Sequence, residues 1–124
     1  MTPIELRVSK DRRTLAMAWP DGARHTLEAE LLRVMSPSAE VQGHSPDQKV
    51  TISGKRDVAI MQMVPTGNYA VRIVFDDMHD TGIFTWRYLR ELGDGRDTHW
   101  RNYEAELAQK GLSREPRRPA RQHL

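Results

Sequence analysis

The histidines are the residues of this sequence with the widest chemical scope, because an imidazole can bind a metal ion or transfer a proton near neutral pH. Two of them, His44 and His79, lie in polar stretches beside several carboxylates. Two imidazoles and one carboxylate can form a weak zinc, iron or nickel site. One hypothesis is therefore a metal site made of His44, His79 and Asp77. Because no close-spaced pattern such as His-x-x-x-His is present, we favour the alternative of two loop histidines without a metal, one of them hydrogen-bonded to a backbone carbonyl.

Other reactive groups are missing or poorly placed. The chain has no cysteine, which excludes disulfides and thiolate metal ligands. It contains neither the Gly-x-Ser-x-Gly pattern of a serine hydrolase nor a glycine-rich phosphate loop. The serines within residues 36–45 suit turns better than nucleophilic catalysis. We therefore expect a protein that is not an enzyme and that needs no cofactor.

The positive charge of the chain is concentrated at its C-terminal end. Residues 113–124 contain four arginines and one glutamate, which give this segment a charge of +3. The net charge of the whole chain is +2, so residues 1–112 carry −1. We predict a folded domain over residues 1–112 and a basic, disordered tail over residues 113–124, which has few apolar groups. With the other arginines scattered, nucleic-acid binding is not favoured. No stretch is apolar enough for a signal peptide or a membrane span, so we expect a cytoplasmic protein without membrane contact.

Alternating apolar residues predict β-strands in the first two-thirds of the chain. Three short strands are expected at residues 4–8, 15–19 and 25–27, with a proline- and glycine-containing turn between the last two. One or two helical turns should follow at 28–35, then a loop at 36–48 and a strand at 49–53.

The strongest hairpin pattern lies at residues 58–75, around the sequence Pro-Thr-Gly. On its first strand, Val58, Ile60 and Val64 should share one face, while the second face, which carries Met61, is apolar too. Strands with two apolar faces are usually central or covered by helices.

Two helices are expected near the C-terminal end, because the apolar spacing changes after residue 82. The first should begin at Trp86 with Thr85 as its N-cap and stop at Gly93, and the second should run from residue 97 to 110. The pattern as a whole predicts an α+β fold, with a twisted, mostly antiparallel sheet and short C-terminal helices in a single small domain.

Two segments carry a family resemblance. The sequences LLRVMSPSAEVQGH at residues 31–44 and VRIVFDDMHDTGIFTWRYLREL at 71–92 resemble, in this order and spacing, the DUF971 family, also described as the gamma-butyrobetaine hydroxylase-like N-terminal domain. The resemblance covers residues 4–111 and is to the free-standing bacterial type, which has no assigned activity. It implies a module that precedes a separate iron- and 2-oxoglutarate-dependent catalytic domain in eukaryotic hydroxylases. Related modules are fused to Mrp-type ATPases that carry iron–sulfur clusters.

The resemblance also implies a zinc site, made in relatives by a Cys-x-Cys-x-x-Cys group and one later histidine. Here Ser36 and Ser38 stand at the first two cysteine positions, the third falls near Glu40 or Val41, and His79 matches the histidine. A serine hydroxyl is a far poorer zinc ligand than a thiolate, and structural zinc needs four firm ligands. We therefore expect the zinc site to be absent and His79 to have a structural role. The chain also has no His-x-Asp or His-x-Glu triplet for a dioxygenase iron site.

The resulting hypothesis is an accessory or protein-interaction module. Because of the fusions known in the family, its expected partner is a protein, in particular an iron–sulfur or redox protein. The sequence favours neither a monomer nor an oligomer. The surface expected to contact the partner comprises Ser36, Ser38, His44, His79, Asp80 and Trp86.

Overall fold

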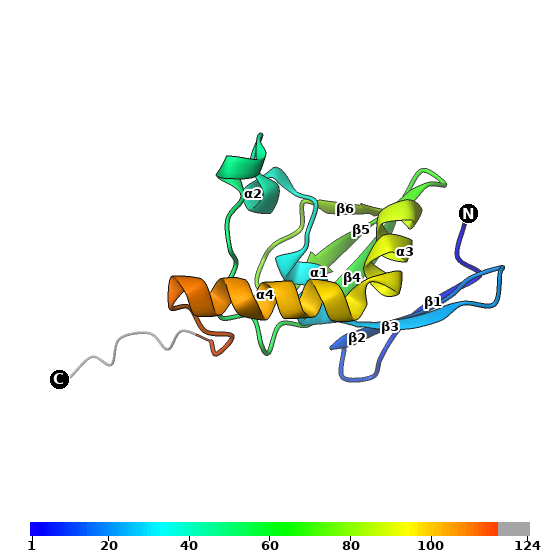
Figure 1. Cartoon of the computed structure of the whole chain (residues 1–124). Helices are drawn as coiled ribbons and strands as arrows, with labels where there is room; N and C mark the ends of the chain where they lie inside the picture. The colour runs from blue at the N-terminus through cyan, green and yellow to red at the C-terminus, as the bar shows by residue number, and fades with distance from the viewer. Residues whose placement is uncertain (117–124) are drawn as a thin grey trace.

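The computed structural model describes residues 1–116, except for the side chain of Pro46. The described part contains two antiparallel three-stranded sheets and short helices, so the α+β fold is confirmed (Figure 1). The first sheet is formed by β1 (Glu5–Val8), β2 (Thr14–Ala18) and β3 (Arg24–Glu28), and the second by β4 (Ile60–Thr66), β5 (Ala70–Phe75) and β6 (Gly82–Thr85). The helices are α1 (Ala29–Val34), α2 (Ala39–Gln42), the 3₁₀ turn η1 (Pro46–Gln48), α3 (Trp86–Asp94) and α4 (Arg96–Lys110).

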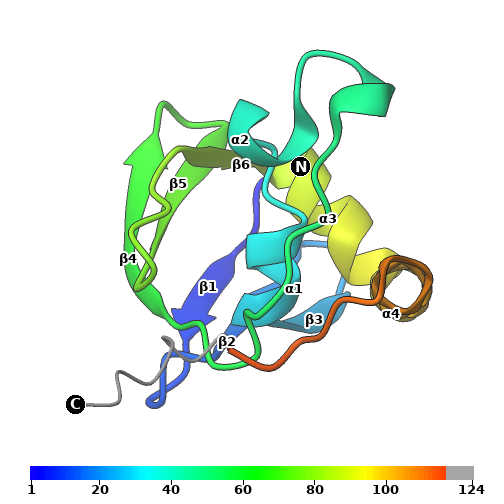
Figure 2. The same cartoon turned by 90° about the vertical axis from the view of Figure 1, so that its left-hand side faces the viewer.

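One hydrophobic core lies between the two sheets. Leu15 and Leu27 pair across β2 and β3 and are fully buried, as are Leu31 of α1 and Phe84 of β6. Helix α1 follows β3 without a break and passes between the sheets (Figure 2). Helices α3 and α4 lie on the side of α1 that faces away from β4 and β5 (Figure 2). Within residues 1–116, no helix covers the opposite, outer face of the β4–β5–β6 sheet (Figure 2).

The register of β4 differs from the sequence prediction. A β-bulge shifts the pairing between Ile60 and Gln62, so that Ile60 and Met63 face the core, opposite Phe75 and Ile73. Val64, which was expected on the buried face, pairs with Arg72 on the outer face. The extra residue of a bulge reverses the alternation beyond it, which periodicity in the sequence does not show.

Two further predictions about strands were wrong. Residues 49–53 form no strand, because the Val50 N–H bonds to the carbonyl of Val41 and the Ile52 carbonyl accepts the Tyr103 hydroxyl of α4, at 2.8 Å and 2.7 Å. Strand β6, conversely, was not expected. It is only four residues long and begins with a glycine, so propensity alone does not indicate it.

The C-terminal helices agree with the sequence in type and differ at their ends. The Thr85 side chain accepts the N–H of Tyr88 at 3.1 Å and caps α3, as predicted, but the helix passes Gly93 and ends at Asp94. Helix α4 begins at Arg96 rather than Asp97. No helix within residues 1–116 is both long and apolar enough for a membrane span.

The first residues of the predicted tail are bound to the domain. The carbonyls of Ser113 and Arg114 accept the N–H groups of Gly54 and Arg56, at 2.8 Å and 3.0 Å. The Arg114 guanidinium donates two hydrogen bonds to the carboxylate of Glu30, which is 5% exposed, at 2.8 Å and 2.7 Å. Residues 117–124, the rest of that tail, lie outside the described residues.

Candidate functional site

The loop between β5 and β6 turns the ring of His79 into the protein. The Asp77 carboxylate accepts the backbone N–H of His79 at 3.1 Å, and the His79 carbonyl accepts the N–H of Phe75 at 3.0 Å. Met78, which lies between Asp77 and His79 in the sequence, has a positive φ of 73°. These local bonds close the loop tightly, and His79 is only 4% exposed.

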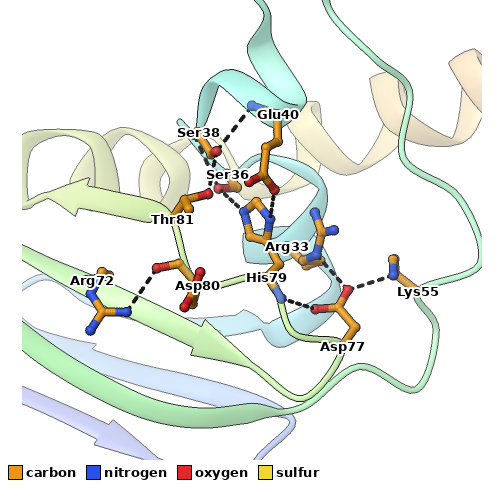
Figure 3. Close-up of polar contacts among 10 residues, drawn as sticks. All are labelled: Arg33, Ser36, Ser38, Glu40, Lys55, Arg72, Asp77, His79, Asp80 and Thr81. Carbon is orange, nitrogen blue, oxygen red and sulfur yellow. Dashed lines mark hydrogen bonds and ion pairs between the residues drawn. The ribbon is translucent and has the colours of Figure 1, made fainter.

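Both ring nitrogens of His79 have partners from the segment around α2 (Figure 3). Nε2 lies 2.8 Å from the hydroxyl of Ser36, and Nδ1 lies 3.0 Å from a carboxylate oxygen of Glu40. A carboxylate only accepts, so the hydrogen is on Nδ1, and Nε2 then accepts the hydroxyl hydrogen of Ser36. His79 therefore joins two segments that are about forty residues apart in the sequence.

A second contact reinforces this link. The hydroxyl groups of Ser38 and Thr81 lie 2.7 Å apart, and the Ser38 hydroxyl also accepts the N–H of Glu40, at 3.2 Å, as the N-cap of α2 (Figure 3). Through these bonds, the short helix α2 is held against the β5–β6 loop.

The order serine, histidine, carboxylate is that of a hydrolase triad, but the geometry does not serve a substrate. Ser36 is fully buried, and its oxygen is also approached by the N–H of Ser38 at 3.3 Å. On its other side Gly82 of β6 is in close contact. A nucleophile must reach the substrate, so the Ser36–His79–Glu40 network acts as a structural link.

The close packing of Gly82 on Ser36 leads to a first prediction. A Cβ at residue 82 would lie closer to Ser36 Oγ than real Cβ atoms approach other atoms, and 3.1 Å from the Phe84 ring. Gly82→Ala should therefore lower the free energy of unfolding by about 2 kcal/mol, within the usual cost of overpacking. Urea unfolding measures this. Gly22→Ala is not a neutral control because of its positive φ, so Gln109→Ala, on an exposed residue of α4, is the reference. An unchanged midpoint for Gly82→Ala would contradict the packing described.

An ion-pair cluster lies beside the network, on the other side of the loop (Figure 3). The Asp77 carboxylate lies 2.7 Å from Arg33 Nε and 2.6 Å from Lys55 Nζ. Burial acts to raise the pKa of Asp77, but the hydrogen bonds from Lys55 and Arg33 outweigh it, so the pKa lies below its ordinary value. Within residues 1–116, Nη1 of Arg33 is buried without a hydrogen-bond partner. Asp77 therefore supplies the negative charge that compensates the buried guanidinium of Arg33.

Asp77 should make stability depend on pH. Because its pKa is lowered in the folded protein, its stabilisation is complete above the ordinary carboxyl range and is lost as the pH falls through the folded-state pKa. Asp77→Asn should cost about 2 kcal/mol at neutral pH, the size of one charge-assisted hydrogen bond, and less at pH 3. Urea unfolding at both pH values measures this. An equal loss at both would mean that the carboxylate charge is not involved.

Only some of the residues of the expected partner surface are accessible to a partner. Ser36, Ser38 and His79 are buried and are used in the contacts above, so they do not offer side chains to a partner. Asp80 is exposed, and Trp86 is partly exposed, with its ring N–H donated to the Asn68 carbonyl at 2.9 Å.

His44 has no contact with His79. It lies exposed in the loop after α2, where its N–H is donated to the Gln48 side chain at 2.9 Å. Within residues 1–116 there is no group of three or more His, Cys, Asp or Glu side chains placed to hold a metal ion. The metal set of His44, His79 and Asp77 remains a prediction that this geometry does not support.

Comparison with known proteins assigns the family. Residues 6–90 match the family model described as gamma-butyrobetaine hydroxylase-like, N-terminal. The chain belongs to this family. A crystal structure of a protein of unknown function from Acidithiobacillus ferrooxidans, assigned to the DUF971 family, is 37% identical over 74% of this chain and 92% of that one, with a TM-score of 0.57. No curated protein matches the chain.

Two solution structures determined by NMR are similar over almost the full length. One is 42% identical and covers 99% of this chain and 97% of that chain, with a TM-score of 0.81. The other is 40% identical and covers 99% and 92%, with a TM-score of 0.79. At this identity and coverage, the whole fold is shared rather than the matched segment alone.

The zinc site implied by the family does not fit the residues of this member. Ser36 and His79 meet, as the alignment of the motif predicts, but a neutral hydroxyl replaces the thiolate, and Nδ1 of the ring is bonded to Glu40. Val41, at the spacing of the third cysteine, is an aliphatic residue, 1% exposed. Hydrogen bonds thus hold together the two segments at which the resemblance implies a zinc site.

Four contributors to the site were not assigned their role from the sequence. Glu40 was considered only as one of several carboxylates near the histidines and beside a lost ligand position, and Arg33, Lys55 and Thr81 were not considered. Arg33 lies in a helical stretch read as apolar, and its partner Asp77 is 44 residues further along the chain. The pairing of a buried cation with the acidic loop has no local signal, so only the fold reveals it.

Proposed function

We propose that this protein is a non-enzymatic accessory module that binds another protein, with iron–sulfur or redox proteins as the expected class of partner. The observation that carries the proposal is the closed Ser36–His79–Glu40 network. The side chains with the chemistry for a reaction are buried and bonded to each other. The partner class rests on the fusions known in the family.

The surface that we propose for the partner runs along β6, from Asp80 to Trp86. Ile83 of β6 is 42% exposed, and Tyr69, whose carbonyl accepts the Trp86 N–H at 3.0 Å, is 57% exposed. Two aromatic residues joined by a backbone hydrogen bond, with an aliphatic residue on the adjoining strand, have the composition of an interface centre. β6 is also an edge strand, bonded only to β5 among the described strands, and edge strands are common binding sites.

The test is capture of partners by the tagged protein, followed by affinity measurement for any partner found. Tyr69→Ala and Trp86→Ala, made one at a time, should each weaken binding about 30-fold, because an aromatic interface anchor contributes about 2 kcal/mol. Ile4→Ala is the matched control, since Ile4 is 68% exposed on the other sheet. Equal losses in the variants and the control, or binding unchanged in all three, would show that β6 is not the contact surface.

The rival metal hypothesis has its own test. Titration of the ¹⁵N-labelled protein with Zn²⁺ and Fe²⁺ follows the imidazoles of His44 and His79. We expect no joint response, because His79 has both nitrogens bonded and is buried. Joint shifts of both rings at low metal equivalents would favour a metal-binding module instead.

A further inference from the structure

A groove with two methionines lies at one end of the uncovered sheet face. Its lining includes Met61 at the bulge of β4, Val74 of β5, and Asp76, Met78 and Asp80 of the β5–β6 loop. The name methionine groove is used for this site below. It lies at the opposite end of β6 from Tyr69 and Trp86, so it is separate from the proposed partner surface except at Asp80.

The apolar part of the groove is unusually exposed. Met78 is 90% exposed and Met61 is 56% exposed. Met78 also has a positive φ, which costs a residue with a side chain about 1 kcal/mol. An apolar side chain is thus exposed to water on a residue whose backbone conformation is itself unfavourable. Unbranched methionine adapts to partners of irregular shape, so such a surface suits a bound peptide segment.

The rim of the groove is acidic and unneutralised. Asp76 accepts the N–H of Ala59 at 3.0 Å, and Arg72 donates to the carbonyl, not the carboxylate, of Asp80. Within residues 1–116, no lysine or arginine forms an ion pair with either Asp76 or Asp80. An occupant that carries positive charges and small apolar groups would match this rim.

The chain itself contains a segment with this composition. Residues 117–124, with the sequence RRPARQHL, combine three arginines with proline, alanine and leucine. They contain no acidic residue, and they follow Pro116 directly.

The last described residues lie near the loop that carries part of the groove. Pro116 and Lys55 line one shared hollow, and Lys55 Nζ lies 2.6 Å from Asp77, which stands between the groove residues Asp76 and Met78. One lysine side chain and one ion pair thus link the hollow beside Pro116 to the β5–β6 loop, whose residues Asp76 and Met78 line the groove. Eight extended residues reach about 26 Å, which is longer than a lysine side chain and an ion pair together.

We propose that residues 117–124 dock in the methionine groove of their own chain, with arginines against Asp76 and Asp80 and apolar groups against Met61 and Met78. The anchor is Arg114, held by Glu30, because it fixes where the segment starts.

The test uses the absence of native cysteine. In the full chain, Gln122→Cys carries a nitroxide label, and the methionine methyl groups are labelled with ¹³C. The signals of Met61 and Met78 should lose intensity relative to the reduced label, while that of Met17, buried in the first sheet, should not. Uniform or absent loss at Met61 and Met78 overturns the proposal.

Two further samples separate the alternatives. Exchange of Arg117, Arg118 and Arg121 for glutamine should restore the Met61 and Met78 signals, and persistence of the loss would overturn the pairing with Asp76 and Asp80. An unchanged signal of Met17, which is buried in the first sheet, shows that the fold is kept in this variant. A mixture of isotope-labelled protein without nitroxide and unlabelled protein with nitroxide should show no loss. Loss in that mixture would assign the occupant to a second copy and overturn docking within one chain.

Discussion

Replacing Arg114 by methionine should destabilise the protein by about 3 kcal/mol, at the lower end of the cost of breaking a buried ion pair, because Arg114 is partly exposed. Glu30 is 5% exposed, and the two hydrogen bonds from Arg114 are its charged contacts within residues 1–116. Without Arg114, a carboxylate remains buried in α1 without its counter-charge. The guanidinium also stacks on Trp100 of α4, 4.8 Å from the ring centre, and this contact would be lost too.

Urea unfolding of four proteins measures the pair: the wild type, Arg114→Met, Glu30→Met and the double variant. Each single change should be strongly destabilising, and the double variant should recover much of the loss, since an apolar pair of similar volume replaces the ions. If the two single effects simply add, the ion pair is not coupled, and another group balances the charge of Glu30.

The Glu30–Arg114 pair also shows where sequence reasoning reached its limit. The stretch at residues 28–35 was expected to form helical turns with Leu31 and Leu32 inward, and α1 has this form. Glu30 of the same helix is buried as well, which no periodicity predicts, because its partner lies 84 residues away. Burial of a charge is decided by a distant partner, and such partners are invisible to local patterns.

Elements set by local chemistry were predictable. The N-cap of α3 at Thr85 and the hairpin around residues 66–70 depend on residues next to one another, and both form. The separation into two sheets, the bulge after Ile60 and the short strand β6 depend on pairing between distant segments. These features set the uncovered sheet face and therefore the methionine groove.

Part of the candidate site was predicted from the family resemblance rather than from local sequence patterns. The proximity of Ser36 and His79 followed from the resemblance to zinc-binding relatives, and the structure brings the two together at 2.8 Å. What the resemblance does not contain is the replacement of zinc by a hydrogen-bond network, because it assigns no hydrogen bond to the Glu40 carboxylate and no role to Thr81. Their role depends on the geometry of the closed loop.

Restoring cysteines should therefore restore metal binding, with the largest effect expected for any change in this chain. The triple variant Ser36→Cys, Ser38→Cys and Val41→Cys should bind one Zn²⁺ with a dissociation constant below about 1 μM, since structural zinc sites reach 10 kcal/mol or more. The thiolates would supply three ligands and His79 the fourth. Competition with a chromogenic chelator measures the affinity, and thermal unfolding should show a rise in melting temperature with zinc that the wild type lacks.

Two controls decide what a result means. Adding His79→Ala to the triple variant should weaken zinc binding, which identifies the histidine as the fourth ligand. A second triple variant with Glu40→Cys in place of Val41→Cys tests the third position, where the sequence allowed either residue. If only the triple variant with Val41→Cys binds zinc, the backbone has kept a geometry that suits a zinc site. The side chains at positions 36, 38 and 41 would then explain why the wild type does not bind zinc. If neither binds zinc, the loop has been reshaped around the Ser36–His79–Glu40 network, and this network is then a replacement for the metal rather than its remnant.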